Sequence, residues 1–146
     1  MEPLDFEQLD REEWRELGFR YGRNTDKRIW HIYGDKLGLS NLCTIIEEYV
    51  STKENEGLSE HEHLGPYQYF KIVTWSEPKI NEQGLFGSLT DLARFGEMFK
   101  GKLDNTNANE QFTIDTEYSD ISTYKLMVHV MPNGFDPASM NYATWK

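Results

Sequence analysis

The amino-acid sequence predicts an α+β fold with two layers, in which two long amphipathic helices cover one face of a mainly antiparallel sheet. Strand-like segments occur in pairs separated by short turns, which is typical of antiparallel hairpins. Two further segments carry one apolar stripe each at helical spacing. Of the 146 residues, 38% are hydrophobic and 14% aromatic, enough to bury a core without staples. We expect a single α+β domain over residues 1–146.

The first third of the chain predicts a short helix, a hairpin and a long helix. Residues 5–13 suit a helix whose acidic side chains form a solvated face. Residues 17–22 and 28–33 alternate as strands around an Asn-Thr-Asp turn, and His31 is expected to pack there beside aromatic side chains. Residues 39–51 then place their apolar side chains on one helical stripe.

The middle of the chain predicts a polar connection and the strongest strand. Residues 52–65 are polar and form a longer connection than usual, of the kind that often carries function. Residues 67–75 alternate with apolar groups on both faces, which predicts a central strand. Residues 80–87 hold one more short extended piece.

The last third predicts a helix and a second hairpin. Residues 88–103 begin with a capping box, in which Asp91 replaces the usual Glu or Gln, and Gly96 predicts a close approach of this helix to the sheet. Residues 111–118 and 123–131 alternate as strands. The aromatic residues of the tail, 135–146, predict that it docks on the domain.

Charge and composition narrow the function classes. The net charge is -10 and the pI is near 4.8, so the surface repels nucleic acid and anionic lipid. The charge would attract a basic protein partner, or it serves only to keep an acidic surface well solvated. No apolar run approaches the roughly 20 residues that span a bilayer. The acidic N-terminus does not resemble a secretory signal, so we expect a cytoplasmic location.

The only cysteine, Cys43, excludes an internal disulfide and a thiolate zinc cluster. It lies on the apolar stripe of the predicted helix at 39–51, which favours a buried structural thiol over a nucleophile.

Four consecutive residues with side chains able to bind metal or transfer protons, Glu60-His61-Glu62-His63, lie immediately before the predicted central strand. On a strand, His61 and His63 would point to one face, where two imidazoles can reach one metal ion. A complete site needs further ligands, for which His129, His31, Asp35 and Asp136 are the candidates. This alternative interpretation predicts haem or a divalent metal as cofactor, with His61, His63 and His129 as ligands.

The same four residues have the right types for acid–base chemistry, so a small hydrolase or lyase is a further alternative. The sequence contains no nucleophile elbow, no Cys-His signature and no phosphate-binding loop. The enzymatic interpretation is therefore the minority one.

The sequence is also rich in aromatic residues, at 14%. Tyr67, Tyr69 and Trp75 share one face of the predicted central strand, and Tyr and Trp are enriched at interface centres. They could form an exposed recognition plate, or they could be covered by helices or by the tail.

Residues 58–75, with Gly34-Asp35 upstream and residues 134–139 downstream, resemble a family of small bacterial proteins. Some of its members resemble predicted immunity proteins of bacterial toxin systems, which are small acidic α+β domains that neutralise a cognate toxin. The resemblance spans residues 14–137. It implies a binding protein and brings no catalytic residues with it.

The sequence therefore predicts a non-enzymatic acidic binding protein, with an immunity-like inhibitor as the specific form. The partner is expected to be a basic protein. The edge strand of either hairpin is also able to pair across a two-fold axis and form a homodimer. The predicted binding residues are Glu60, His61, Glu62, His63, Tyr67 and Tyr69.

Overall fold

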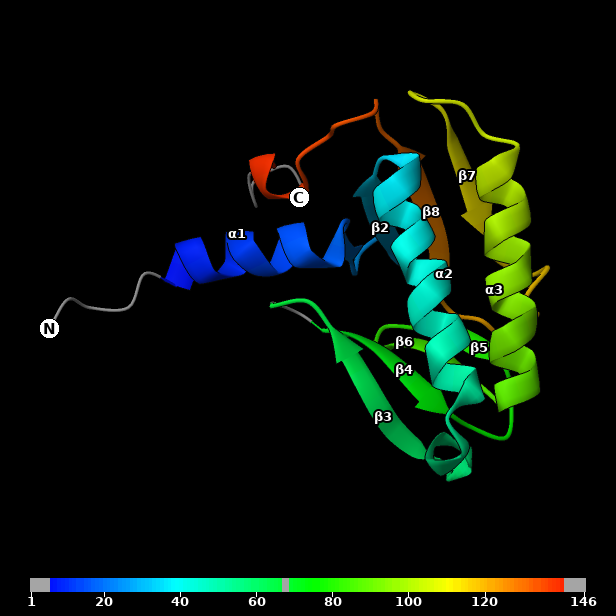
Figure 1. Cartoon of the computed structure of the whole chain (residues 1–146). Coiled ribbons are helices and arrows are strands. Elements are labelled where there is room, and N and C mark those ends of the chain that lie inside the picture. Colours follow the sequence, from blue (N-terminus) through cyan, green and yellow to red (C-terminus); the bar gives the residue numbers. More distant parts are fainter. Residues whose placement is uncertain (1–5, 67–68, 141–146) are drawn as a thin grey trace, which may run out of the picture.

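The computed structural model describes residues 6–66 and 69–140, which form three α-helices and eight strands (Figure 1). The helices are α1 (Phe6–Leu17), α2 (Lys36–Ser51) and α3 (Leu89–Asp104), with short 3-10 helices η1 (Lys53–Glu56) and η2 (Pro137–Ser139). The strands are β1 (Arg20–Asn24), β2 (Ile29–Gly34), β3 (Ser59–Leu64), β4 (Phe70–Thr74), β5 (Lys79–Asn81), β6 (Gly84–Gly87), β7 (Gln111–Ile114) and β8 (Lys125–Val130).

The α+β class is confirmed, and the strands divide into two mixed sheets of four strands each. One sheet has the order β1-β2-β8-β7 and the other has the order β3-β4-β6-β5. In each sheet two antiparallel hairpins meet at a parallel central pair, β2 with β8 and β4 with β6. Four of the six pairings are antiparallel, as the hairpin pattern predicted. The parallel pairs join β2 to the distant β8, and β4 to β6 past the intervening β5, which the local pattern did not reveal.

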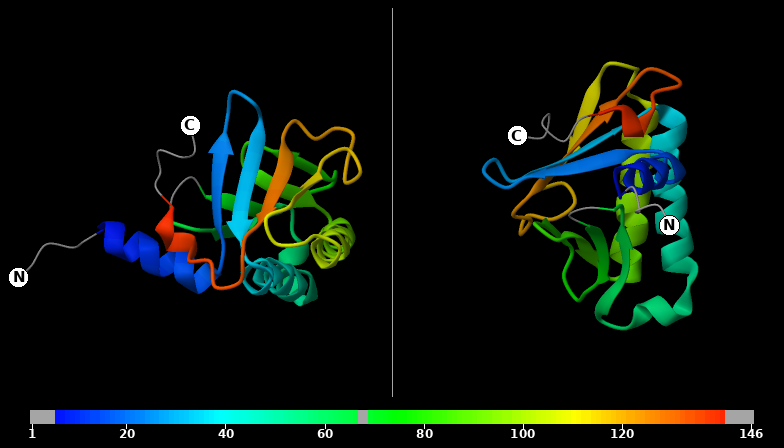
Figure 2. Two further views of the ribbon diagram at one scale, coloured as in Figure 1. Left: turned by 90° about the horizontal axis from the view of Figure 1, so that it is seen from above. Right: turned by 90° about the vertical axis from the view of Figure 1, so that its left-hand side faces the viewer.

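Helices α2 and α3 lie side by side and cover both sheets from one side (Figures 1 and 2). Near its start α2 packs on the first sheet, where Leu39 contacts Gly34. Near its end Tyr49 hydrogen-bonds Thr74 of the second sheet at 2.7 Å. The two helices therefore bridge the sheets, and one continuous core fills the space between the layers.

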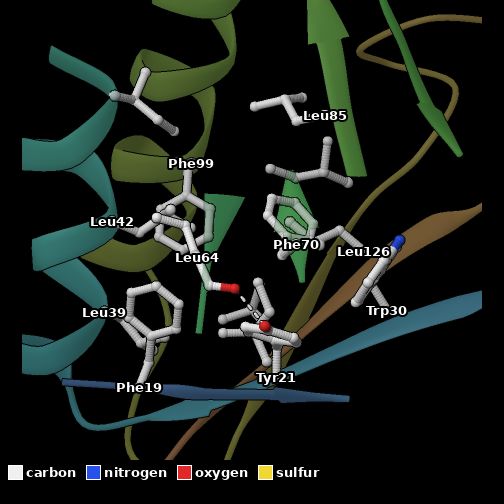
Figure 3. Close-up of a cluster of buried hydrophobic side chains, with 14 of the residues drawn as sticks. Phe19, Tyr21, Trp30, Leu39, Leu42, Leu64, Phe70, Leu85, Phe99 and Leu126 are labelled. Carbon is white, nitrogen blue, oxygen red and sulfur yellow. Dashed lines mark hydrogen bonds between the residues drawn. The ribbon is translucent and has the colours of Figure 1, made fainter. Parts of the chain in front are cut away.

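The two sheets also touch each other directly through aromatic side chains (Figure 3). Trp30 of β2 meets Phe70 of β4 edge to face, with ring centroids 5.0 Å apart. Its indole N–H donates to the carbonyl of Asn81 in β5 at 2.8 Å. The core is thus shared, because neither sheet has a complete apolar cover without the other.

Helix boundaries follow the capping chemistry. Asp35 caps α2 by accepting from the Gly38 amide at 2.8 Å, so the helix begins at Lys36, earlier than predicted. Ser88 and Asp91 form the predicted capping box of α3. Gly96 does permit a close approach, but the neighbour is Ile46 of α2 and not the sheet.

Three strand predictions need correction. The first strand begins at Arg20, because α1 continues to Leu17. The connection predicted at 52–65 contains η1 and β3, whose polar residues lie at a sheet edge where alternation of apolar groups is not required. Residues 79–87 form two strands, β5 and β6, joined by a tight turn.

The predicted central strand is confirmed, since β4 lies between β3 and β6. Its first two predicted residues, 67 and 68, lie outside the described residues. The tail docks as far as it is described: Ala138 in η2 is buried, and η2 packs against α1. Cys43 is also buried, and burial raises the pKa of its thiol. In the described part of the chain, none of the helices combines the length and apolarity needed to cross a bilayer.

The contact between α2 and the loop before β1 predicts a large effect at one glycine. A Cβ on Gly38 would lie 1.9 Å from the Gly18 carbonyl oxygen, so backbone would have to move. We expect Gly38→Ala to lower the free energy of unfolding by about 2 kcal/mol or more in urea denaturation.

The matched control is Gly101→Ala on α3, where no atom outside the helix's own neighbouring backbone lies within 4 Å of the new methyl group. Alanine should stabilise that helix by up to about 1 kcal/mol. Equal effects of the two substitutions would contradict the close contact at Gly38.

Candidate functional site

The cluster Glu60-His61-Glu62-His63 lies in β3, which is an edge strand of the second sheet. Residues 59–63 are all exposed, and only Leu64 is buried. The outer edge of β3 has no strand partner among the described residues. The cluster is therefore a polar sheet edge and not the tip of a loop.

A register shift between Glu60 and Glu62 breaks the regular alternation of β3. It brings Glu60 and His63 to the same face, with Glu60 Oε2 3.6 Å from His63 Nδ1. Lys71 of β4 lies on this face and its Nζ is 3.0 Å from Glu60 Oε1. The ring of Tyr69 contacts His63 at a centroid distance of 4.4 Å, with the two rings tilted by 46°. Four side chains thus form one small polar and aromatic cluster.

His61 has different surroundings from His63. Its Nε2 donates to the Gly57 carbonyl at 2.6 Å, and its ring lies 6.2 Å from that of Tyr49. The expectation that both imidazoles share one face assumed a regular strand, which the register shift removes. Glu62 is exposed on β3, while Tyr67 lies outside the described residues.

His129 lies in β8 of the other sheet and pairs with His31 instead of His61 and His63. His31 Nδ1 and His129 Nε2 are 3.0 Å apart, so one imidazole donates to the other. Tyr33 stacks on His129 at 4.2 Å with nearly parallel rings. His31 is thus a strand residue among aromatic rings, as predicted. Within residues 6–66 and 69–140, no three or more His, Cys, Asp or Glu side chains are grouped to hold a metal ion.

The end of β3 faces α1 (Figure 1). An acidic groove is lined by side chains from both of these parts of the chain. It is an open hollow of about 560 Å³. One wall is the face of α1 that carries Leu9, Asp10, Glu12, Glu13 and Glu16, and the other wall is formed by His63, Gly65, Pro66 and Tyr69. A second hollow of about 230 Å³ continues past Glu13, Glu16 and His63 to Asn41 of α2.

The charged side chains that line this acidic groove are all negative. Four carboxylates line it, and no lysine or arginine is among its described lining residues. Glu13 and Glu16 have no hydrogen-bond or ion-pair partner in the described part of the chain. Leu9 and Tyr69 are both partly exposed large side chains, at 45% and 46%. The groove thus offers negative charge beside apolar surface.

Contacts at the C-terminal half of α1 hold the acidic wall in place. Trp14 is 2% exposed and meets the ring of Tyr21 edge to face at 5.0 Å. Arg15 forks onto Asp136 with distances of 3.2 and 3.1 Å, and this bond holds the pKa of the Asp136 carboxyl below its usual value. Asn41 donates to the Leu17 carbonyl at 2.7 Å.

The sequence interpretation placed His63 and Tyr69 in the binding site but assigned the carboxylates of α1 to a solvated face. They are solvent-accessible, so the local prediction is right about their exposure. The local pattern could not predict the groove itself, because its opposite wall comes from residues about 50 positions further along the chain. A one-sided run of acidic residues on a helix with a buried Trp14 was the available signal.

Comparison with protein-family models, with curated proteins and with solved structures finds no match for this chain. The resemblance to immunity-like proteins therefore stays an expectation that bears on the proposal below.

The hydrogen bond between Tyr21 of the first sheet and Leu64 of β3 predicts an effect on stability. The Tyr21 hydroxyl donates to the carbonyl of the buried Leu64. Tyr21→Phe leaves that carbonyl without this donor, and we expect a loss of about 1–3 kcal/mol in the free energy of unfolding.

Tyr69→Phe is the matched control, because Tyr69 is exposed. It should change stability by less than about 0.5 kcal/mol in the same urea titration. An equally small effect of Tyr21→Phe would show that the hydroxyl does not stabilise the join.

The histidine pair predicts a pH dependence of stability. Burial, followed by the charge of His31, lowers the pKa of His129 from 6.5 to about 4. The unfolded chain therefore binds more protons than the folded chain between these values, so stability is fully present above about pH 6.5 and falls toward pH 4. Because His129 is only half-buried, we expect a loss of about 1 kcal/mol.

His129→Gln should flatten the profile of unfolding free energy against pH in this window. The carboxylates titrate in both proteins, so the difference between the two profiles isolates the histidine. Parallel profiles would contradict the assignment.

Proposed function

We propose that this protein is a non-enzymatic binding protein that holds a basic segment of a partner protein in the acidic groove. The more specific form of the proposal is an immunity-like inhibitor that acts in the cytoplasm on a basic bacterial toxin. The observation that carries it is the lining of the groove, which holds four carboxylates and, among its described residues, neither lysine nor arginine.

Charge supports a basic partner. The net charge of -10 attracts a cationic protein over a distance, and the groove concentrates that charge between two walls. Electrostatic complementarity of this kind increases association rates and excludes acidic partners.

The apolar residues of the groove support a protein ligand rather than a small cation. Leu9, Pro66 and Tyr69 lie beside the carboxylates, where the aliphatic stem of a lysine or arginine could pack. Tyr69 also offers a ring face for a guanidinium group. Tyrosine on the groove and arginine on a basic partner are both residue types that dominate protein interfaces.

The resemblance to immunity-like proteins supplies the experiment. The proposal predicts that a toxin domain is encoded immediately upstream of this gene. Such a domain should be expressed in bacteria with and without the present chain. We expect the chain to restore colony formation and to bind the purified domain. Glu12→Gln/Glu13→Gln/Glu16→Gln should weaken that complex by roughly tenfold or more, since each lost charge contributes up to about 1 kcal/mol.

The matched control neutralises the same number of exposed carboxylates on the other helices. Glu47→Gln/Glu48→Gln/Glu97→Gln changes the net charge equally but leaves the groove intact. If no toxin domain is neutralised, the immunity proposal is wrong. If both triple variants bind equally, the groove is not the binding site.

A further inference from the structure

We propose that β3 is also a dimerisation edge, at which two copies of this chain pair their β3 strands antiparallel about a two-fold axis. This inference goes beyond the proposed function, because it needs no partner other than a second copy. The pairing would join two four-stranded sheets into one of eight strands.

The edge is available for pairing. Five consecutive residues of β3 are exposed, and among the described residues β3 pairs only with β4. An uncovered edge strand presents backbone groups that can bond to another chain, and native proteins usually protect such edges with like charges. The edge of β3 does not carry an unbroken row of like charges, because imidazoles alternate with the carboxylates along it.

The alternation is self-complementary. When Glu60-His61-Glu62-His63 is read against its own reverse, every carboxylate faces an imidazole. Glu60 of one copy then lies opposite His63 of the other, and His61 lies opposite Glu62. In each such pair the imidazole N–H can donate to the carboxylate, and cross-strand pairs of interacting side chains stabilise adjacent strands.

The register shift makes this pairing compatible with backbone geometry. In a regular strand, residues three apart direct their backbone groups to opposite edges, so Glu60 and His63 could not both face a second copy. The register shift between Glu60 and Glu62 leaves His61 as an extra residue without a partner in β4. Glu60 and His63 therefore direct their backbone groups to the same edge. The 3.6 Å contact between Glu60 and His63 follows from it.

Charge and apolar surface favour the same arrangement. Lys71 neutralises Glu60 at 3.0 Å, so this edge lacks much of the negative charge that separates copies elsewhere. Leu58 is 62% exposed at the start of β3, and Tyr69 is 46% exposed near its end. Antiparallel pairing would cover Leu58, while Tyr69, which lies on the β4 side of β3, stays in the acidic groove.

The test is sedimentation equilibrium of the full chain over a wide concentration range. We expect a monomer–dimer equilibrium with a dissociation constant of the order of 10 µM, as for a small interface. A protein that stays monomeric at the highest concentration overturns the proposal.

Two charge variants then test the register. His61→Glu/His63→Glu makes the edge wholly acidic, and Glu60→Lys/Glu62→Lys makes it basic. Each variant alone should be monomeric, because like charges would face each other across the axis. An equimolar mixture should form a heterodimer at least as tight as the wild-type dimer, which also shows that both variants are folded.

The matched control is Glu47→Lys/Glu48→Lys on the exposed side of α2, which makes the same change in charge as the basic β3 variant. It should not abolish the dimer. If both β3 variants still dimerise alone, or if their mixture does not dimerise while the wild type does, the pairing is not at β3. No partner protein enters these measurements, so their outcome is independent of the proposed function.

Discussion

The ring of Tyr21 is the point on which the rest of the structure depends. It contacts Trp14 of α1, Trp30 of β2 and Phe70 of β4, with centroid distances of 5.0, 5.6 and 6.2 Å. Its hydroxyl donates to the carbonyl of Leu64 at the end of β3 (Figure 3). One side chain therefore joins the N-terminal helix and both sheets, and supplies a buried carbonyl with the donor it needs.

Immediately after β3 the backbone packs against the ring of Tyr21. Gly65 has a φ of +81°, and a Cβ there would lie 2.3 Å from the Tyr21 hydroxyl oxygen, so a glycine is required on two grounds. Because Trp14 packs on the same ring, the separation between α1 and the end of β3 is set by the core. The walls of the acidic groove are thus positioned by buried aromatic packing, while the groove itself stays open to solvent.

His63 connects the two surfaces proposed here. It lines the acidic groove and also belongs to the β3 edge, where it contacts Glu60. A dimer through β3 would place two acidic grooves near one interface, related by the two-fold axis. A basic segment bound in one groove would then lie beside the paired β3 strands.

Histidine spacing shows how far sequence reasoning reached at the site. The H-x-H pattern correctly marked the exposed segment before the central strand, and His63 and Tyr69 do lie together. The shared face of His61 and His63 depended on regular alternation, which one register shift changes. His129 could not be placed at all, because its partner His31 is 98 residues away and is reached through parallel pairing of β2 with β8.

The sequence by itself determined the α+β class, the two long helices and the central position of β4. These depend on periodicity and capping within short windows, where neighbouring residues meet whatever the rest of the chain does. Only the tertiary structure decided the division into two sheets, the parallel pairs and the groove between α1 and β3. Those features depend on which distant apolar faces share one core, and packing selects that arrangement only when the whole chain is folded.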